Sequence, residues 1–380
     1  MTEIHGSCDD RFASVREAFT RNFEEGLDVG ASVAVTVDGE MVVDLWGGHV
    51  DEERTTPWER DTIINVWSTT KTMTALCALV LADRGELDLD APVARYWPEF
   101  AAAGKDGVLV RNVMSHTAGV PAWDPPVVED DLYDWEKSTS MLAAQAPWWE
   151  PGTASGYHAI SQGHLIGEIV RRITGQSLGT FFAHEIAGPL GADFHIGLPP
   201  EHDHRTVRVI PPPPLPVGTL PTDSIAYRAF TGPPLRAEAS WDEVWRRAEI
   251  PAANGQGNAR SVATVQTIVA CRGEANGVRL LSEKTCERIF EVQSVGTDLV
   301  LGVPLRLGIG YGIVGEEVPL TPSPTTCFWG GWGGSIVTAD LANRMCVTYV
   351  MNRMGEGTVG DIRGAMIVAG AYSALAALSG

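Results

Sequence analysis

Apolar residues follow two different periodicities along the chain, and each predicts one kind of element. Runs rich in β-branched residues at 30–37 and 41–46 flank Asp38-Gly39, a pair typical of hairpin turns. Later runs of the same kind predict strands at 305–314, 326–340 and 345–351. Apolar residues recur at helical spacing in 11–27, 69–84, 161–174, 185–190, 258–270 and 360–378. This order predicts an α/β (α+β) fold, in which an antiparallel sheet built from both chain ends is flanked by helices and the middle region is mostly helical.

The segment 205–240 follows neither periodicity. Its run Pro211–Pro214 and its further prolines cannot pair in a central sheet or continue a helix. We therefore expect a long irregular loop, of the kind that is usually functional or disordered, rather than a linker between domains. The expected organisation is a single domain over 1–380, with an α/β part at 1–75 and 255–380 and a mostly helical part at 76–254.

The composition of the chain argues against several classes of function. Hydrophobic residues make up 44% of the chain, and the mean hydropathy is close to zero, as in a globular protein with a sizeable core. A net charge of -20 argues against nucleic acid or an anionic membrane as partner. No apolar run reaches membrane-spanning length, and residues 1–6 show no signal-peptide core. With six cysteines and no Cys-x-x-Cys pair, we expect free thiols and a cytoplasmic location.

A candidate catalytic pair, Ser68-x-x-Lys71, lies where the helix at 69–84 begins. Spacing of three puts both side chains on one helical face. A serine nucleophile needs a base beside it, and desolvation lowers the pKa of a lysine enough for it to act as one. The segment 73–82 carries no charge, and only four of the chain's 28 lysine and arginine residues are lysines. Because Ser-x-x-Lys also arises by chance in a chain of this length, the pair alone does not establish catalysis.

Further landmarks follow in order. They are Met114-Ser115-His116-Thr117-Ala118-Gly119, Pro151-Gly152-Thr153 with Gly156-Tyr157, Gly257-Asn258-Ala259-Arg260-Ser261, and Trp329-Gly330-Gly331. Together with Ser68-Thr69-Thr70-Lys71, they resemble the serine β-lactamase-like, or penicillin-binding-protein-like, hydrolase superfamily, above all the family VIII carboxylesterases. The resemblance spans roughly residues 15–375. It implies a β-lactamase/transpeptidase-like fold and a serine hydrolase that needs no cofactor and no metal.

The resemblance also implies roles for individual residues. Ser68 is the expected nucleophile, and Lys71 and Tyr157 are the expected proton-handling pair, with the phenolate of Tyr157 favoured beside a lysine ammonium. The backbone N–H groups of Ser68 and Trp332 are expected to form the oxyanion hole.

Five positions are expected to bind substrate: Trp329, Gly330, Gly331, Ala159 and His158. Two of them depart from the penicillin-recognising pattern, because Ala159 stands in place of an asparagine and Trp329 in place of a lysine. A β-lactam would lose its amide and carboxylate partners there, so small, fairly apolar, uncharged esters are favoured. His158 is alternatively a packing histidine, and the run 329–334 is alternatively a plain Gly-rich turn.

The loop at 211–235 and four tryptophans are candidates for the pocket wall, although the tryptophans suit a core equally well: Trp123, Trp135, Trp148 and Trp149. The predicted function is a serine carboxylesterase that acts on small-molecule esters through a Ser68 acyl-enzyme. Alternatives are an amidase, an acyltransferase, a weak β-lactamase, or a silent relative that only binds a ligand. The absence of Gly-x-Ser-x-Gly argues against an α/β-hydrolase. The oligomeric state stays open, with a homodimer among the options.

Overall fold

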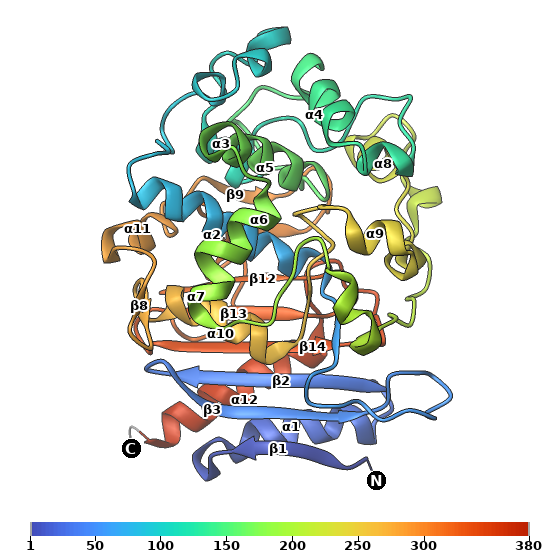
Figure 1. The fold of residues 1–380 in the computed structure, drawn as a ribbon, viewed down its shortest axis with the longest axis vertical. Helices are drawn as coiled ribbons and strands as arrows, with labels where there is room; N and C mark the ends of the chain where they lie inside the picture. Colours follow the sequence, from blue (N-terminus) through green and yellow to red (C-terminus); the bar gives the residue numbers. More distant parts are fainter. Residues whose placement is uncertain (1, 379–380) are drawn as a thin grey trace.

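The computed structural model describes residues 2–378, so Met1 and residues 379–380, which the expected domain at 1–380 includes, lie outside the described residues. Its main sheet has nine strands in the order β1-β3-β2-β14-β13-β12-β11-β10-β9, and every neighbouring pair is antiparallel. The strands are β1 Ile4–Cys8, β2 Gly30–Val37, β3 Glu40–Gly48, β9 Ser294–Thr297, β10 Pro304–Leu307, β11 Gly312–Ile313, β12 Thr326–Gly330, β13 Ile336–Asp340 and β14 Met345–Met351. The two ends of the chain therefore share one sheet, which confirms the predicted fold class (Figure 1).

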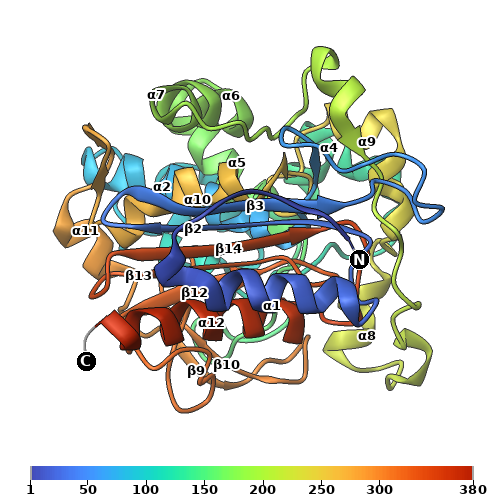
Figure 2. The same ribbon diagram turned by 90° about the horizontal axis from the view of Figure 1, so that it is seen from below.

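Helices cover both faces of this sheet. On one face α1 Ala13–Glu24 packs against α12 Ile362–Leu378, and on the other α10 Ala259–Ala270 packs against β2, β13 and β14 (Figure 2). Asn258 begins α10 as a capping box, because its side chain accepts the N–H of Ser261 and Ser261 Oγ accepts the N–H of Asn258, both at 3.0 Å.

The helix that follows Ser68, α2 Thr70–Asp83, is the centre of the helical region. All of its residues from Thr70 to Leu81 are buried, as expected for a helix that is apolar all round. It packs against α5 Ser161–Thr174 and α6 Leu178–Phe182. The remaining helices are α3 Val110–Met114, α4 Trp135–Ala144, α7 Gly188–Leu190, α8 Ile225–Thr231, α9 Glu243–Arg247 and α11 Glu283–Arg288.

Three sequence-based boundaries were wrong. The expected strand at 305–314 is a pair, β10 and β11, and the expected strand at 326–340 is β12 and β13 joined by a turn. Gly333 and Gly334, with φ of 95° and 127°, break that second run. The helical end expected at 185–190 is continuous with α6 through a π-helical turn. The segment 205–240 is mostly irregular, but it contains β5 Thr206–Val207 and α8.

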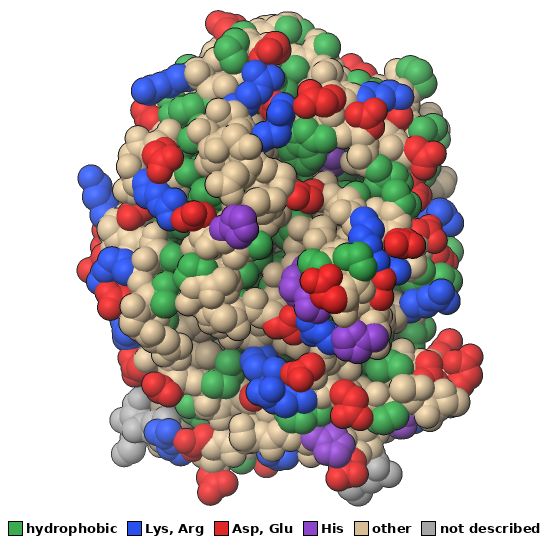
Figure 3. Space-filling model, in the orientation of Figure 1, with side chains coloured by type: hydrophobic (Ala, Val, Ile, Leu, Met, Phe, Trp, Pro, Cys, Tyr) green, Lys and Arg blue, Asp and Glu red, His purple; other side chains and the backbone are tan. Residues whose placement is uncertain are grey.

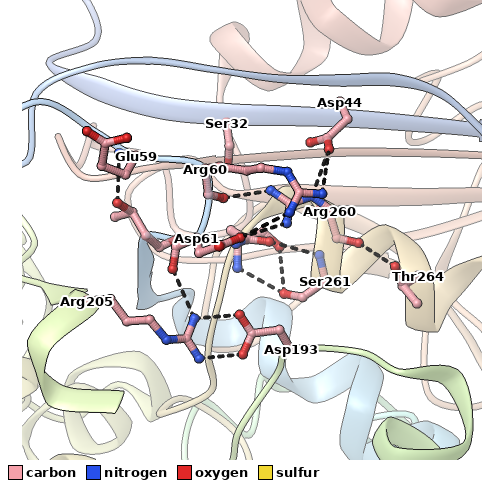
Figure 4. A network of polar contacts seen from close by, with 12 residues as sticks. Ser32, Asp44, Glu59, Arg60, Asp61, Asp193, Arg205, Arg260, Ser261 and Thr264 are labelled. Atoms are coloured by element: carbon pink, nitrogen blue, oxygen red, sulfur yellow. Dashed lines mark hydrogen bonds and ion pairs between the residues drawn. The ribbon is translucent and has the colours of Figure 1, made fainter. Parts of the chain in front are cut away.

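A small sheet leads the chain to Ser68. Its central strand, β4 Ile63–Asn65, pairs with β5 and with β6 Gln256–Gly257. A polar network fixes the segment just before β4 (Figure 4). Arg260 of α10 bonds Asp44 of β3 at 2.8 Å and the carbonyl of Arg60 at 2.6 Å. Arg205 donates to the carbonyl of Asp61 at 3.0 Å and pairs with Asp193 through both terminal nitrogens. The network thus joins the main sheet to the helical region beside the strand that precedes the nucleophile.

Acidic and basic side chains are interspersed over the face shown in Figure 3. Within residues 2–378, no helix is long and apolar enough to cross a membrane.

Candidate active site

Ser68 lies on a sharp turn between β4 and α2. Trp67, just before it, has φ +50°, a left-handed conformation that bulky side chains rarely adopt. Packing holds it there, since its buried ring contacts the rings of Trp245 and Trp332 at centroid distances of 5.5 and 5.0 Å. Thr70 Oγ1 also donates to the Trp67 carbonyl at 2.5 Å. The turn is therefore strained and well supported, a combination typical of functional sites.

The structure brings the three predicted catalytic side chains together. Lys71 Nζ lies 3.0 Å from Ser68 Oγ, and the Tyr157 hydroxyl lies 2.6 Å from the same oxygen. Lys71 Nζ also donates to the carbonyls of Ala159 at 2.6 Å and Ala252 at 2.9 Å. The two carbonyls occupy two N–H groups, and a neutral amine has a lone pair left for Ser68.

Burial favours the neutral forms of both proton-handling groups. It lowers the pKa of Lys71 well below the usual lysine value. It also raises the pKa of the Tyr157 phenol, and the hydrogen bond with Ser68 offsets this only in part. Burial therefore works against the Tyr157 phenolate beside a lysine ammonium that the resemblance implies, because both charged forms lose their hydration in this interior.

Asp298 holds the segment that carries Tyr157. Its Oδ1 accepts the N–H groups of Tyr157, Val300 and Leu301 at 3.0, 2.9 and 2.9 Å, and the residue is 1% exposed. Sequence reasoning missed Asp298, since nothing around it resembles a motif and it lies far from Tyr157 in the chain.

Two buried histidines hold the same segment. The His158 N–H donates to His116 Nδ1 at 3.1 Å, and His158 Nε2 accepts the Val120 N–H at 3.2 Å. Burial lowers the pKa of His158 to about 3 and that of His116 well below its ordinary value, so both rings are neutral. His158 therefore has the contacts of a packing histidine, the alternative left open above.

The turn after β12 brings Trp332 to the nucleophile. Ser335 Oγ donates to the Val66 carbonyl at 3.0 Å and lies 2.9 Å from Thr69 Oγ1, so it ties this turn to both sides of Ser68. Gly331 permits the approach, because a Cβ there would lie 2.4 Å from the Val66 oxygen. Neither the Ser68 N–H nor the Trp332 N–H bonds another residue in the described part of the chain.

Above Ser68 opens a cavity of about 510 Å³. Ser68, Tyr157, Ala159 and Trp332 line it, and the loop at 211–235 forms much of its wall, as predicted. Further lining residues are Trp67, Ile160, Phe230, Arg236, Ala237, Glu238, Ala253, Leu301 and Thr358. The wall is mostly apolar, apart from Arg236, Glu238 and a few hydroxyl groups.

Four residues expected to bind substrate do not line this cavity: Trp329, Gly330, Gly331 and His158. The Trp329 ring is buried beneath the site, where it stacks on His116 at 5.4 Å and contacts Tyr157 at 5.6 Å. The four tryptophans considered for the wall lie elsewhere too. Trp123 donates to the Ser138 carbonyl, and Trp135 stacks on His164, so both rings pack within the helical region. No group of His, Cys, Asp and Glu side chains within 2–378 has an arrangement that could hold a metal ion.

This fold and site define a serine hydrolase of the esterase/β-lactamase type. A family model described as Beta-lactamase matches residues 19–370, and the chain belongs to that family. The esterase/beta-lactamase LipL of Mycobacterium tuberculosis is 34% identical over 363 residues, covering 92% of this chain and 83% of the relative.

Solved structures agree with this assignment. A family VIII carboxylesterase superposes with a TM-score of 0.92 at 44% identity, covering 98% of this chain and 100% of the other. A penicillin-binding protein homolog from Caulobacter crescentus has a TM-score of 0.89 at 36% identity, with the same coverage. The resemblance inferred from the motifs is confirmed.

Proposed function

We propose that this chain is a carboxylesterase that hydrolyses small, fairly apolar esters through an acyl-enzyme on Ser68. One observation carries the proposal. The Ser68 hydroxyl contacts both a buried amine and a buried phenol at the floor of an apolar cavity. Such a hydroxyl has a base on one side and a proton donor on the other, as acyl transfer requires.

In the acylation step, Ser68 Oγ attacks the ester carbonyl carbon while its proton passes to the neutral Lys71 amine. The N–H groups of Ser68 and Trp332 stabilise the oxyanion that forms. As the ester C–O bond breaks, the Tyr157 phenol gives its proton to the departing alcohol oxygen. The acyl-enzyme then holds a Lys71 ammonium and a Tyr157 phenolate, and the Lys71 nitrogen lies 4.8 Å from the phenol ring centre. These opposite charges stabilise each other in the interior.

Deacylation reverses these roles. The Tyr157 phenolate takes a proton from a water molecule as the water oxygen attacks the acyl carbon. Ser68 Oγ leaves and takes back its proton from the Lys71 ammonium, which releases the acid. Each group ends in its starting state, and no other proton carrier is needed.

The substrate preference follows from the cavity wall. Ala159 lines the cavity with a methyl group that cannot bond an amide, and the Trp329 ring does not line it. The wall is built largely from the proline-rich loop, which suits the alkyl or aryl groups of an ester.

A fluorophosphonate probe tests the proposal, because it labels activated serines. Peptide mapping should find the label on Ser68, and Ser68→Ala should neither be labelled nor hydrolyse p-nitrophenyl butyrate. Hydrolysis should be insensitive to ethylenediaminetetraacetate. Lack of labelling, or a label on another serine, would overturn the assignment.

A further inference from the structure

The cavity wall has an uneven distribution of charge. Two charged side chains line it, Arg236 and Glu238. Arg236 has an acidic partner outside the wall, since its Nη2 lies 3.5 Å from Glu129 Oε2. Glu238 is half-buried, and no hydrogen bond or ion pair joins its carboxylate to any other residue of the described chain. Glu238 is therefore the one charged side chain of the wall that has no direct partner among the described residues.

Aromatic rings line the same cavity. Phe230 and Trp332 are half-buried in its wall, and Trp67 and Tyr157 line it near the nucleophile. The faces of aromatic rings attract cations, above all quaternary ammonium groups, whose methyl shells also suit an apolar wall. An unpaired carboxylate together with aromatic rings is a combination that recognises alkylammonium groups.

We propose that the cavity selects esters that carry an ammonium group away from the reacting carbonyl and discriminates against esters that carry a carboxylate. This inference rests on the proposed esterase function and names its substrate class. The net charge of -20 acts in the same direction, because it attracts cations and repels anions at long range. The same carboxylate would disfavour β-lactams, which carry a carboxylate of their own.

Three aryl acetates test the proposal: 3-(trimethylammonio)phenyl acetate, its neutral isostere 3-tert-butylphenyl acetate, and 3-carboxyphenyl acetate. The substituents change leaving-group reactivity, so the quantity compared is the ratio of kcat/KM for the cationic ester to that for the neutral ester. Glu238→Gln should lower this ratio about fivefold, the effect of a partly screened charge pair several ångströms apart. Hydrolysis of the neutral ester by Glu238→Gln is the reference in this ratio, and it also shows that the variant is folded. The carboxylate ester should be hydrolysed faster by the variant than by the wild type.

Glu243→Gln is the matched control. It changes the net charge equally, but Glu243 is an exposed residue of α9 and does not line the cavity. Its ratio should stay within about twofold of the wild type, and added salt should shrink the effect of Glu238→Gln. An unchanged ratio in Glu238→Gln, or an equal fall in Glu243→Gln, would overturn the inference. Absence of neutral-ester hydrolysis by the wild type, or its persistence in Ser68→Ala, would instead overturn the proposed function.

Discussion

Replacing Asp298 with alanine should displace Tyr157 and so lower kcat. This effect can be distinguished from the loss of fold stability that the same substitution causes. A single buried oxygen of Asp298 accepts three backbone N–H groups, one of them from Tyr157 itself. Asp298→Ala removes all three bonds, and the N–H groups of Tyr157 and Val300 stay buried without a partner. Asp298→Asn retains a carbonyl oxygen in the same place, although without the negative charge.

The size of the effect follows from these contacts. A hydrogen bond to a charged group contributes about 1.5–3 kcal/mol, and three that share one oxygen do not add fully. We expect Asp298→Ala to lose about 3–5 kcal/mol of unfolding free energy, with a smaller loss for Asp298→Asn. If the Tyr157 hydroxyl moves by about 1 Å from its 2.6 Å contact with Ser68, kcat should fall by about a hundredfold. KM should rise by a smaller factor than kcat falls. This rise is expected because Leu301, which lines the cavity, also loses its hydrogen bond to Asp298.

The assay is kcat and KM on p-nitrophenyl butyrate per active site, counted by fluorophosphonate titration, beside urea unfolding. Asp340→Ala is the matched control. Asp340 is also a fully buried carboxylate with several hydrogen bonds, but it lies at the end of β13 away from Trp332. It should lose stability while each folded molecule keeps its kcat. If Asp298→Ala kept a kcat within threefold of the wild type, or if Asp340→Ala lost as much, the positioning argument would fail.

Four further predictions concern the site itself. Ser68→Ala should abolish ester hydrolysis with an unchanged Tm; a residual rate above a few per cent would contradict the nucleophile assignment. Because burial lowers the pKa of Lys71 and the neutral amine is the base, kcat/KM should fall as pH drops through that lowered pKa, and Lys71→Arg should be nearly inactive at every pH; an active arginine variant would disprove the role of the amine. The wild type should have a far higher kcat/KM on p-nitrophenyl butyrate than on nitrocefin, and Ala159→Asn should raise nitrocefin acylation only modestly; comparable values for the two substrates would refute the substrate class. Ser335→Ala should lower kcat about tenfold with little change in KM, because the Trp332 turn loses its tie to Val66 and Thr69; an unchanged kcat would show that the turn holds without Ser335.

Local patterns predicted most of the elements. The strands at 30–37 and 345–351 and the helices at 161–174 and 360–378 lie within a few residues of their observed bounds. Boundaries failed where a turn interrupted an apolar run, as at Gly333 and Gly334. Apolar periodicity records burial, and a buried turn has the same composition as a buried strand.

The sequence alone determined the contact between Ser68 and Lys71, because three residues along a helix place two side chains on one face whatever surrounds them. It also determined that the surroundings of Lys71 are apolar, and hence that the pKa of the lysine is low. Family resemblance added Tyr157, whose hydroxyl does reach Ser68.

Only the tertiary structure decided the rest of the site. The Ala252 carbonyl that bonds Lys71, the Asp298 carboxylate that holds Tyr157 and the Ser335 hydroxyl that ties the Trp332 turn lie 181, 141 and 269 residues from their partners. The burial of the Trp329 ring and the position of Glu238 in the cavity wall were also decided by the tertiary structure alone. No periodicity in the sequence relates residues so far apart. Their contacts depend on how the sheet, α2 and the proline-rich loop pack together, and that packing is a property of the whole chain.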